Sequence, residues 1–297
     1  MKASGIGGQA VLEGIMMKNG DNYAVAVRKP DGQIEIMKDT CKKRSGMIEK
    51  IKKYPFIRGV FSFIDSLVLG MSTLTWSSQF QEEQEVVMTE KREKIEMILT
   101  IAASIGITII LFMLLPYFIT DLLKTWVPSY TLRLVIEGIV RITIFVSYVG
   151  IISFMDDIKR VYQYHGAEHK CINCIENGYT LTVENVRKSS KEHKRCGTSF
   201  MMFVMIVGIV LLFFVRVESV LMRVIVRIAL LPVIAGISYE IIRWAGRSEN
   251  IIVCMLSKPG LALQKLTTKE PDDDMIEVAI RAVEEVFDWR AFLQDGE

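Results

Sequence analysis

Four long apolar runs dominate the hydropathy pattern of this 297-residue chain. Each is close to the roughly 20 residues that an α-helix needs to cross a bilayer. Because main-chain polar groups in lipid have to be satisfied within the segment, a helix is the expected spanning form. The runs extend from about Ile98 to Phe118, Leu132 to Met155, Ser199 to Val217 and Val220 to Ile242. The pattern predicts a mainly α, polytopic membrane protein with four transmembrane helices.

Three polar regions surround these runs. Residues 1–95 come before the first run, residues 156–198 connect the second and third, and residues 244–297 follow the fourth and are typical of a helical region. The membrane domain is therefore expected at residues 96–243. Lys and Arg are frequent in the three polar regions and rare in the two remaining connections. The positive-inside rule then places both termini and the loop 156–198 in the cytoplasm.

The N-terminal region contains a strand pattern and an ambiguous apolar segment. Residues 22–29 (NYAVAVRK) alternate as a strand does, Pro30-Asp31-Gly32 is a turn signal, and alternation resumes at Ile34. We expect a small β-hairpin here. Residues 55–80 are apolar with one charge pair, Arg58 and Asp65. This segment is interpreted as an interfacial or re-entrant helix, and a helix packed on the spans is the alternative.

Net charge and cysteine usage add modest constraints. The formal net charge is only +2, so nucleic acid is not an expected partner. The apolar runs make the lipid bilayer the expected partner instead. The cysteines are Cys41, Cys171, Cys174, Cys196 and Cys254. All lie in regions placed in the cytoplasm, so reduced thiols are expected rather than disulfides. The pair Cys171-x-x-Cys174 is either half of a zinc site or incidental.

The three histidines of the chain all fall between positions 165 and 193. His165 and His169 are four residues apart, which puts both imidazoles on one face of a helix, and Glu168 lies beside the second. His-x-x-Glu-His is the arrangement in which two histidines bind zinc and the glutamate takes a proton from the bound water. We therefore expect a metal site, with zinc as the first candidate and Glu168 as the catalytic residue.

A third metal ligand has to come from elsewhere, and the segment His193-Lys194-Arg195-Cys196 offers two. Either His193 or Cys196, or both, could complete the site. If His165, His169, His193 and Cys196 all bind, the tetrahedron is full, which is typical of a structural metal. A set with one open position is typical of catalysis.

Four further ionisable residues are candidates for substrate binding or accessory roles. Glu137 and Arg141 lie four apart within a predicted span, where ionisable side chains are functional candidates. Glu240 lies near the cytoplasmic end of the last span, and Glu13 lies in an apolar, glycine-containing stretch. An ordinary structural ion pair is the competing interpretation for each.

Several longer motifs resemble the YqhQ-like family of bacterial membrane proteins, which are predicted metal-dependent enzymes of unknown function. The matching segments are residues 7–17 (GGQAVLEGIMM), 28–32 (RKPDG), 164–170 (YHGAEHK), 195–200 (RCGTSF), 238–240 (SYE), 259–261 (PGL) and 264–268 (QKLTT). The resemblance covers nearly the whole chain. It implies a multi-pass protein of the bacterial cytoplasmic membrane, with His165, Glu168, His169, His193 and Cys196 as site residues. Cys171 and Cys174 do not belong to any of the matching segments.

Three functions are compatible with these features. The first is a membrane-bound, metal-dependent hydrolase that acts on a peptide, lipid headgroup or small molecule at the cytoplasmic membrane face. The second is a transporter or channel with a metal-stabilised cytoplasmic loop. Four spans are few for a transporter, so this hypothesis implies a homo-oligomer. The third is a membrane assembly factor with a structural metal.

Overall fold

The structure is a computed structural model that describes residues 3–41, 46, 51, 53–81, 90–193, 195–215, 219–245 and 250–294. The chain forms two compact units. Unit 1 comprises residues 1–81, 152–203 and 235–297, and unit 2 comprises residues 82–151 and 204–234. Unit 1 therefore gathers three segments that are far apart in sequence, and all three histidines belong to it.

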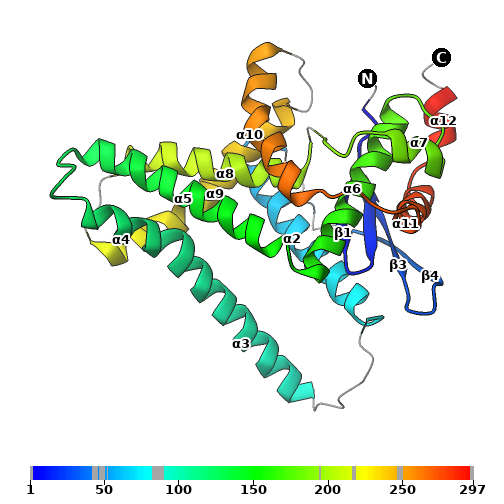
Figure 1. The fold of residues 1–297 in the computed structure, drawn as a ribbon, viewed down its shortest axis with the longest axis horizontal. Coiled ribbons are helices and arrows are strands. Elements are labelled where there is room, and N and C mark those ends of the chain that lie inside the picture. Colours follow the sequence, from blue (N-terminus) through cyan, green and yellow to red (C-terminus); the bar gives the residue numbers. More distant parts are fainter. Residues whose placement is uncertain are drawn as a thin grey trace. The chain divides into compact units, whose positions relative to one another are not determined.

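Unit 1 begins with a four-stranded antiparallel sheet (Figure 1). Its strands are β1 (Ile6–Val11), β2 (Gly14–Asn19), β3 (Asn22–Arg28) and β4 (Ile34–Thr40), paired in that order. The predicted hairpin is confirmed as β3 and β4, and Gly32 in its turn adopts a φ of 84° that glycine tolerates. The sequence does not predict β1 and β2. Glycines interrupt the alternation in β1, and Ile15, Met16 and Met17 in β2 are all buried, so no polar face marks the strand.

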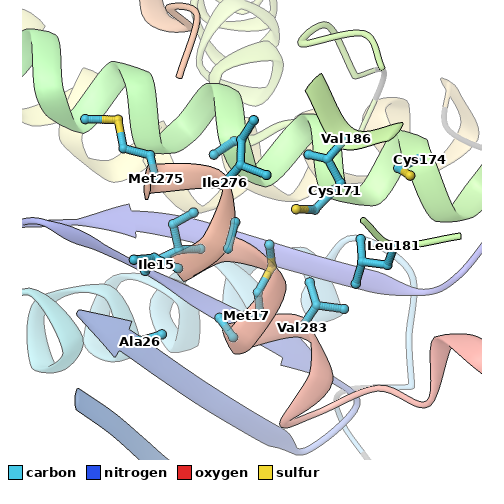
Figure 2. Packing of buried hydrophobic residues seen from close by; sticks show 14 of the residues in the cluster. Ile15, Met17, Ala26, Cys171, Cys174, Leu181, Val186, Met275, Ile276 and Val283 are labelled. Atoms are coloured by element: carbon cyan, nitrogen blue, oxygen red, sulfur yellow. The ribbon is translucent and has the colours of Figure 1, made fainter. Parts of the chain in front are cut away.

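Both faces of this sheet are covered. On one face, α6 (Asp156–Glu176) packs against β1 and β2, and α11 (Asp273–Glu284) packs against β2 and β3. The short helix α7 (Val183–Lys188) packs against these two helices, and all three contribute to the apolar cluster in Figure 2. On the opposite face, Val25 and Val27 pack with Leu69 and Trp76 of α2 (Ile57–Ser78). The core of unit 1 therefore consists of two layers of apolar contacts on either side of one sheet.

The connection between the second and third predicted spans is largely helical. It holds α6, a helix of 21 residues, followed by the shorter α7. The acidic pair Asp156 and Asp157 lies in the first turn of α6, where negative charge interacts favourably with the helix dipole. The C-terminal region contains α10 (Ile251–Thr267), α11 and α12 (Trp289–Gln294). α6 is thus the rigid element on which the histidines lie.

Within the described part of the chain, four helices are long and apolar enough to cross a membrane. They are Ile57–Ser78, Ile95–Leu122, Tyr130–Ile152 and Val224–Ala245. The second combines most of α3 (Glu90–Ile109) with the π-helical turn η1 (Ile110–Leu114) and α4 (Leu115–Leu122). The third is α5 (Tyr130–Ile152), and the fourth lies in α9 (Val220–Ala245).

This set differs from the sequence prediction at two helices. α2 is long and apolar enough to cross a membrane, whereas the sequence predicts an interfacial or re-entrant helix at this position. The predicted third span corresponds to α8 (Gly197–Leu212), whose 16 residues measure only about 24 Å at 1.5 Å per residue. Residues 216–218, where the predicted span ends, lie outside the described part of the chain.

Candidate metal centre

His165 and His169 lie one turn apart on α6, as their spacing predicts, with ring centroids 4.4 Å apart. Each ring is held through its Nδ1 by a main-chain carbonyl. The acceptor is Thr267 O for His165, at 2.9 Å, and Lys191 O for His169, at 2.7 Å. Because a carbonyl only accepts, Nδ1 of each neutral ring carries the proton and Nε2 keeps a lone pair. A backbone carbonyl on the second nitrogen is a common arrangement around metal-binding histidines.

The third member of the cluster is Cys196. Its Sγ lies 3.1 Å from Nε2 of His165, so the thiol can donate to that lone pair. Among the described residues, one ligand atom each of His165, His169 and Cys196 lie within 4.8 Å of one another. His169 and Cys196 are buried and His165 is partly buried. Two imidazoles and a thiol form a donor set that suits zinc.

His193, the other predicted ligand, lies beside this cluster and faces a different group. Its ring centroid is 5.8 Å from that of His169, and its Nε2 lies 3.5 Å from Oε2 of Glu176. The structure therefore brings three of the four predicted ligands together. A three-ligand set leaves one tetrahedral position open.

Successive side chains on α6 hold the backbone of residues 187–192. Lys170 Nζ donates to the carbonyls of Arg187 and Ser189, at 2.8 and 2.9 Å. One turn later, Asn173 Nδ2 donates to the carbonyls of Ser190 and Glu192, at 2.6 and 3.0 Å. The same helix that carries the two histidines thus also determines the path of the segment that leads to Cys196.

Glu176, at the end of α6, completes this anchorage. Its carboxylate accepts from the main-chain N–H and hydroxyl of Ser4, at 2.8 and 2.7 Å, and pairs with Arg195. Burial alone would raise the pKa of Glu176. Hydrogen bonds from His193 and Ser4 and the charge of Arg195 outweigh burial and lower the pKa to about 2. Glu176 is therefore ionised at neutral pH and connects the N-terminus to the residue before Cys196.

Helix α10 supports the site from its other side. The buried Gln264 accepts from the N–H of His193, at 2.9 Å, and donates to its carbonyl, at 2.8 Å. The same amide donates to the hydroxyl of Ser199, at 2.9 Å. At Gly166, α6 also approaches the segment that follows α10, so closely that a Cβ there would lie 2.0 Å from Lys269 O. Only glycine permits this contact, which lies two residues beyond the carbonyl that holds His165.

Glu168, the predicted catalytic residue, is buried where α6 meets β1. Its carboxyl accepts from the N–H of Gly8, and a Cβ on Gly8 would come within 3.0 Å of its Cδ. Burial raises the pKa of Glu168, while the neighbouring His165 and the Gly8 N–H oppose that shift. The side chain thus contacts β1, and it does not belong to the group of three metal-binding candidates among the described residues.

Two of the predicted accessory acids form ion pairs within unit 1. Glu13 lies in the β1–β2 turn with a φ of 49°, and both its oxygens pair with Arg160 of α6. Glu240 accepts from Arg58, with 2.6 Å between Nε and Oε1, and from the N–H of Phe56. Each acid therefore connects two elements of unit 1, and neither belongs to the group of three metal-binding candidates.

The other two, Glu137 and Arg141, belong to a buried ion cluster in unit 2. Glu137 Oε1 accepts from Arg141, at 2.7 Å, and pairs with Arg227 of α9. The guanidinium groups also donate to the carbonyls of Phe112 and Met113 in η1, at 3.0 and 3.2 Å. Proline at 116 has no N–H for the Phe112 carbonyl, which explains why Arg141 can occupy it. The cluster joins three helices.

Cys171 and Cys174 belong to the hydrophobic core of unit 1 (Figure 2). Burial raises the pKa of both thiols, for Cys171 well above its usual range. The sulfur of Cys174 donates weakly to the carbonyls of Tyr179 and Thr180. These residues therefore pack as small apolar side chains and are separate from the cluster.

Sequence reasoning missed the residues that hold the site together. Lys170, Asn173, Glu176 and Gln264 act on backbone atoms of distant segments, so no spacing rule identifies them. Gln264 lies within one of the segments that resemble the YqhQ-like family, and Lys170 ends another. The resemblance to the family was therefore the only signal in the sequence for these two residues, and it did not indicate what their side chains do.

The fold and the cluster define a class: a multi-helix membrane protein with a small sheet-containing unit that carries a His/His/Cys centre. Residues 54–289 match the family model "Protein of unknown function (DUF1385)". The chain is also 37% identical over 303 residues to "Uncharacterized protein YqhQ" of Bacillus subtilis (strain 168), covering 98% of this chain and 95% of that protein. No solved structure matches. The chain belongs to the DUF1385 family, and the predicted YqhQ-like membership is confirmed.

Proposed function

We propose that this chain is a membrane-bound, zinc-dependent hydrolase that acts at the cytoplasmic face of the bacterial inner membrane. In this proposal His165, His169 and Cys196 hold the ion, and Glu168 accepts and returns a proton. The cytoplasmic assignment comes from the distribution of Lys and Arg in the sequence. The substrate class remains a peptide, a lipid headgroup or a small molecule.

The observation that carries the proposal is the cluster of three ligand atoms within 4.8 Å, with both Nδ1 atoms already bound to carbonyls. The two Nε2 atoms and the sulfur are the donors that remain for an ion. Because His193 faces Glu176, one coordination position stays open for water or substrate. A zinc ion with three protein ligands lowers the pKa of water in that position to about 7.

The residues around the cluster have separable roles in this proposal. The carbonyls of Thr267 and Lys191 orient the two imidazoles, and the contacts from α6 position Cys196. Glu168 is the carboxylate next to His169 in sequence, and it is shielded from bulk water between α6 and β1. A buried carboxylate beside a metal site is typical of a general base.

The test is metal content followed by a substitution that separates metal binding from proton transfer. Elemental analysis of the detergent-purified protein should give about one zinc per chain, lost in His165→Ala/His169→Ala. The matched control Cys174→Ser should keep the metal. Glu168→Gln should also keep it and abolish hydrolysis in a screen of peptide, phosphoester and acyl-ester substrates. Absence of zinc in the parent protein, even after zinc is supplied, would contradict the proposal.

A structural role for the metal is the second candidate, because one observation favours it. The two carbonyls that hold the histidines come from separate segments, around Lys191 and Thr267, so a bound ion would join α6 to both. In that case removal of zinc by a chelator would lower the unfolding temperature strongly, and Glu168→Gln would change neither zinc content nor any activity.

A further inference from the structure

We propose that α2 does not cross the membrane but lies along the bilayer surface, with its apolar face in contact with lipid. The helix has the length and hydropathy of a span, so this assignment runs against its composition. It rests on contacts within unit 1 and is independent of the proposed hydrolase function.

The side chains of α2 form an exposed apolar face and a separate buried face. The exposed face carries the large apolar residues Ile57, Ile64, Leu67, Val68, Met71 and Leu74, and Val68 is 62% exposed. The buried face carries Gly59, Gly70, Thr73 and Ser77. At 100° per residue the mean directions of the two groups lie about 130° apart, so the two faces are distinct. A helix that is apolar on one side and packed on protein on the other is suited to an interface.

The packed face of the C-terminal half covers the β-sheet. Ser77 Oγ accepts from the N–H of Leu12 at 3.2 Å, and a Cβ at Gly70 would meet the side chain of Gln9. Leu69 and Trp76 pack on the sheet face that contains Val25.

An open sheet cannot lie within hydrocarbon, because its edges carry unpaired main-chain groups. This sheet also carries charged side chains such as Glu35, which is about half exposed. If residues 69–78 follow the sheet, only residues 57–68 remain to cross. Twelve residues of helix measure about 18 Å, which is too short for a hydrocarbon core of about 30 Å.

The chain connectivity leads to the same conclusion. The sheet precedes α2 in sequence, yet it packs against the C-terminal half of the helix. If α2 crossed the bilayer, residues 41–56 would have to cross it in the opposite direction. That segment contains six basic residues, namely Lys42, Lys43, Arg44, Lys50, Lys52 and Lys53. Charged side chains at bilayer depth are costly, so the composition of this segment argues against such a return crossing.

The N-terminal end of α2 lies beside the C-terminal half of a candidate span, which supports lipid as the occupant of the exposed face. A Cβ at Gly59 would lie 2.7 Å from Cβ of Tyr239, and a Cβ at Gly236 would lie 2.7 Å from Phe56 O. Both α9 residues belong to the candidate span Val224–Ala245. The exposed Tyr54 and Phe56 precede the helix, and aromatic side chains favour the membrane–water interface. The apolar face is therefore continuous with a membrane-embedded helix.

Spin-label depth measurements test the proposal on the full chain. Ile57, Val68 and Thr75 lie on one face of α2 and are exposed, so each is replaced singly by cysteine in a Cys41→Ser/Cys254→Ser background. The protein is reconstituted in vesicles of phosphatidylcholine and phosphatidylglycerol. Collision with oxygen and with a water-soluble nickel chelate then gives the depth of each label. Labelling of the background protein measures any contribution from the remaining buried cysteines.

We expect the three α2 labels to lie at one shallow depth, within about one helical turn (~5 Å) of each other. The matched control is α5, where labels at Leu132, Ile139 and Ile151 should show Ile139 deeper than the other two by about 10 Å. Two outcomes would overturn the proposal. One is the α5 profile repeated in α2, with Val68 deepest. The other is preferential collision of all three α2 labels with the nickel chelate, which would place the face in water.

Discussion

The Nε2 atom of His165 lies 3.1 Å from the Sγ of Cys196, although the two residues are 31 positions apart. Neither atom is free to turn away. The ring of His165 is held through Nδ1 by the Thr267 carbonyl, and Cys196 ends a segment that side chains of α6 anchor by its backbone. Donor atoms that are oriented before an ion arrives lose little conformational freedom on binding, so this geometry supports the proposal that the cluster binds a metal.

Replacement of Cys196 by serine should therefore weaken zinc binding severely. Serine keeps the size of the side chain but removes the thiolate that zinc prefers. Loss of a direct ligand should cost more than the roughly 10–100-fold that changes to outer partners of metal ligands cost. Competition titrations with a chromogenic chelator measure the effect. Cys174→Ser is the control, because that thiol is buried on the same helix as the histidines but outside the cluster. Equal zinc affinity in Cys196→Ser and the parent protein would exclude Cys196 as a ligand.

Much of the fold follows from local sequence, because long apolar runs and turn signals act within one segment. The apolar runs around residues 98–118, 132–155 and 220–242 correspond to candidate spans, and Pro30-Asp31-Gly32 located the β3–β4 turn. The i,i+4 spacing of His165 and His169 likewise placed both rings on one face of a helix. Each of these predictions depends on a periodicity that a single element imposes on its own sequence.

The remaining features depend on contacts between distant segments. Two backbone carbonyls hold the histidines, and a carbonyl is present at every residue, so no sequence pattern distinguishes Thr267 or Lys191. The selection of Cys196 over His193 depends on Glu176, which draws the His193 ring toward itself. Strands β1 and β2 escaped prediction because their apolar residues are buried on both faces. The position of α2 could not be decided from hydropathy, because a sheet covers half of the helix.

Gly166→Ala should destabilise the protein and weaken the metal site together. The new Cβ would lie 2.0 Å from Lys269 O, so the backbone beyond α10 has to move. Overpacking of this kind costs about 1–3 kcal/mol. The displaced segment includes the Thr267 carbonyl that orients His165, so zinc affinity should also fall. Gly106→Ala is the control, because a Cβ there meets nothing within 4 Å. Thermal unfolding in detergent and zinc titration measure both effects, and a Gly166→Ala protein that matches the Gly106→Ala protein would contradict the packing argument.

Glu176→Gln should lower stability in a pH-dependent manner. The folded pKa of Glu176 is about 2, below the usual unfolded value of about 4.3. The contribution of the Glu176 carboxylate to the free energy of unfolding is therefore complete above the unfolded pKa, and it is lost as the pH falls from about 4 toward 2. Hydrogen bonds to a charged group contribute about 2 kcal/mol, so the variant should unfold earlier at pH 7. The difference in stability between Glu176→Gln and the parent protein should become smaller at pH 4 and below. Glu192→Gln, which removes a charge of the same sign from the same segment, should show a small difference. If the stability difference between Glu176→Gln and the parent protein is constant from pH 7 to pH 3, the lowered pKa of Glu176 in the folded protein would be contradicted.

Glu137→Gln tests whether the buried ion cluster of unit 2 serves stability or transport. Glu137 and Arg227 are almost fully buried, and removal of the shared carboxylate would leave two guanidinium groups without their anionic partner. Breaking a buried ion pair in this way costs about 3–5 kcal/mol. Glu96→Gln is the control in the same unit, because its pair with Arg92 is exposed and lies at the same i,i+4 spacing. An exposed helical pair contributes only about 0.3–0.5 kcal/mol. Denaturant unfolding of reconstituted protein should therefore separate the two variants clearly. If both unfold like the parent protein and Glu137→Gln instead alters ion flux across proteoliposomes, the cluster would belong to a transport pathway.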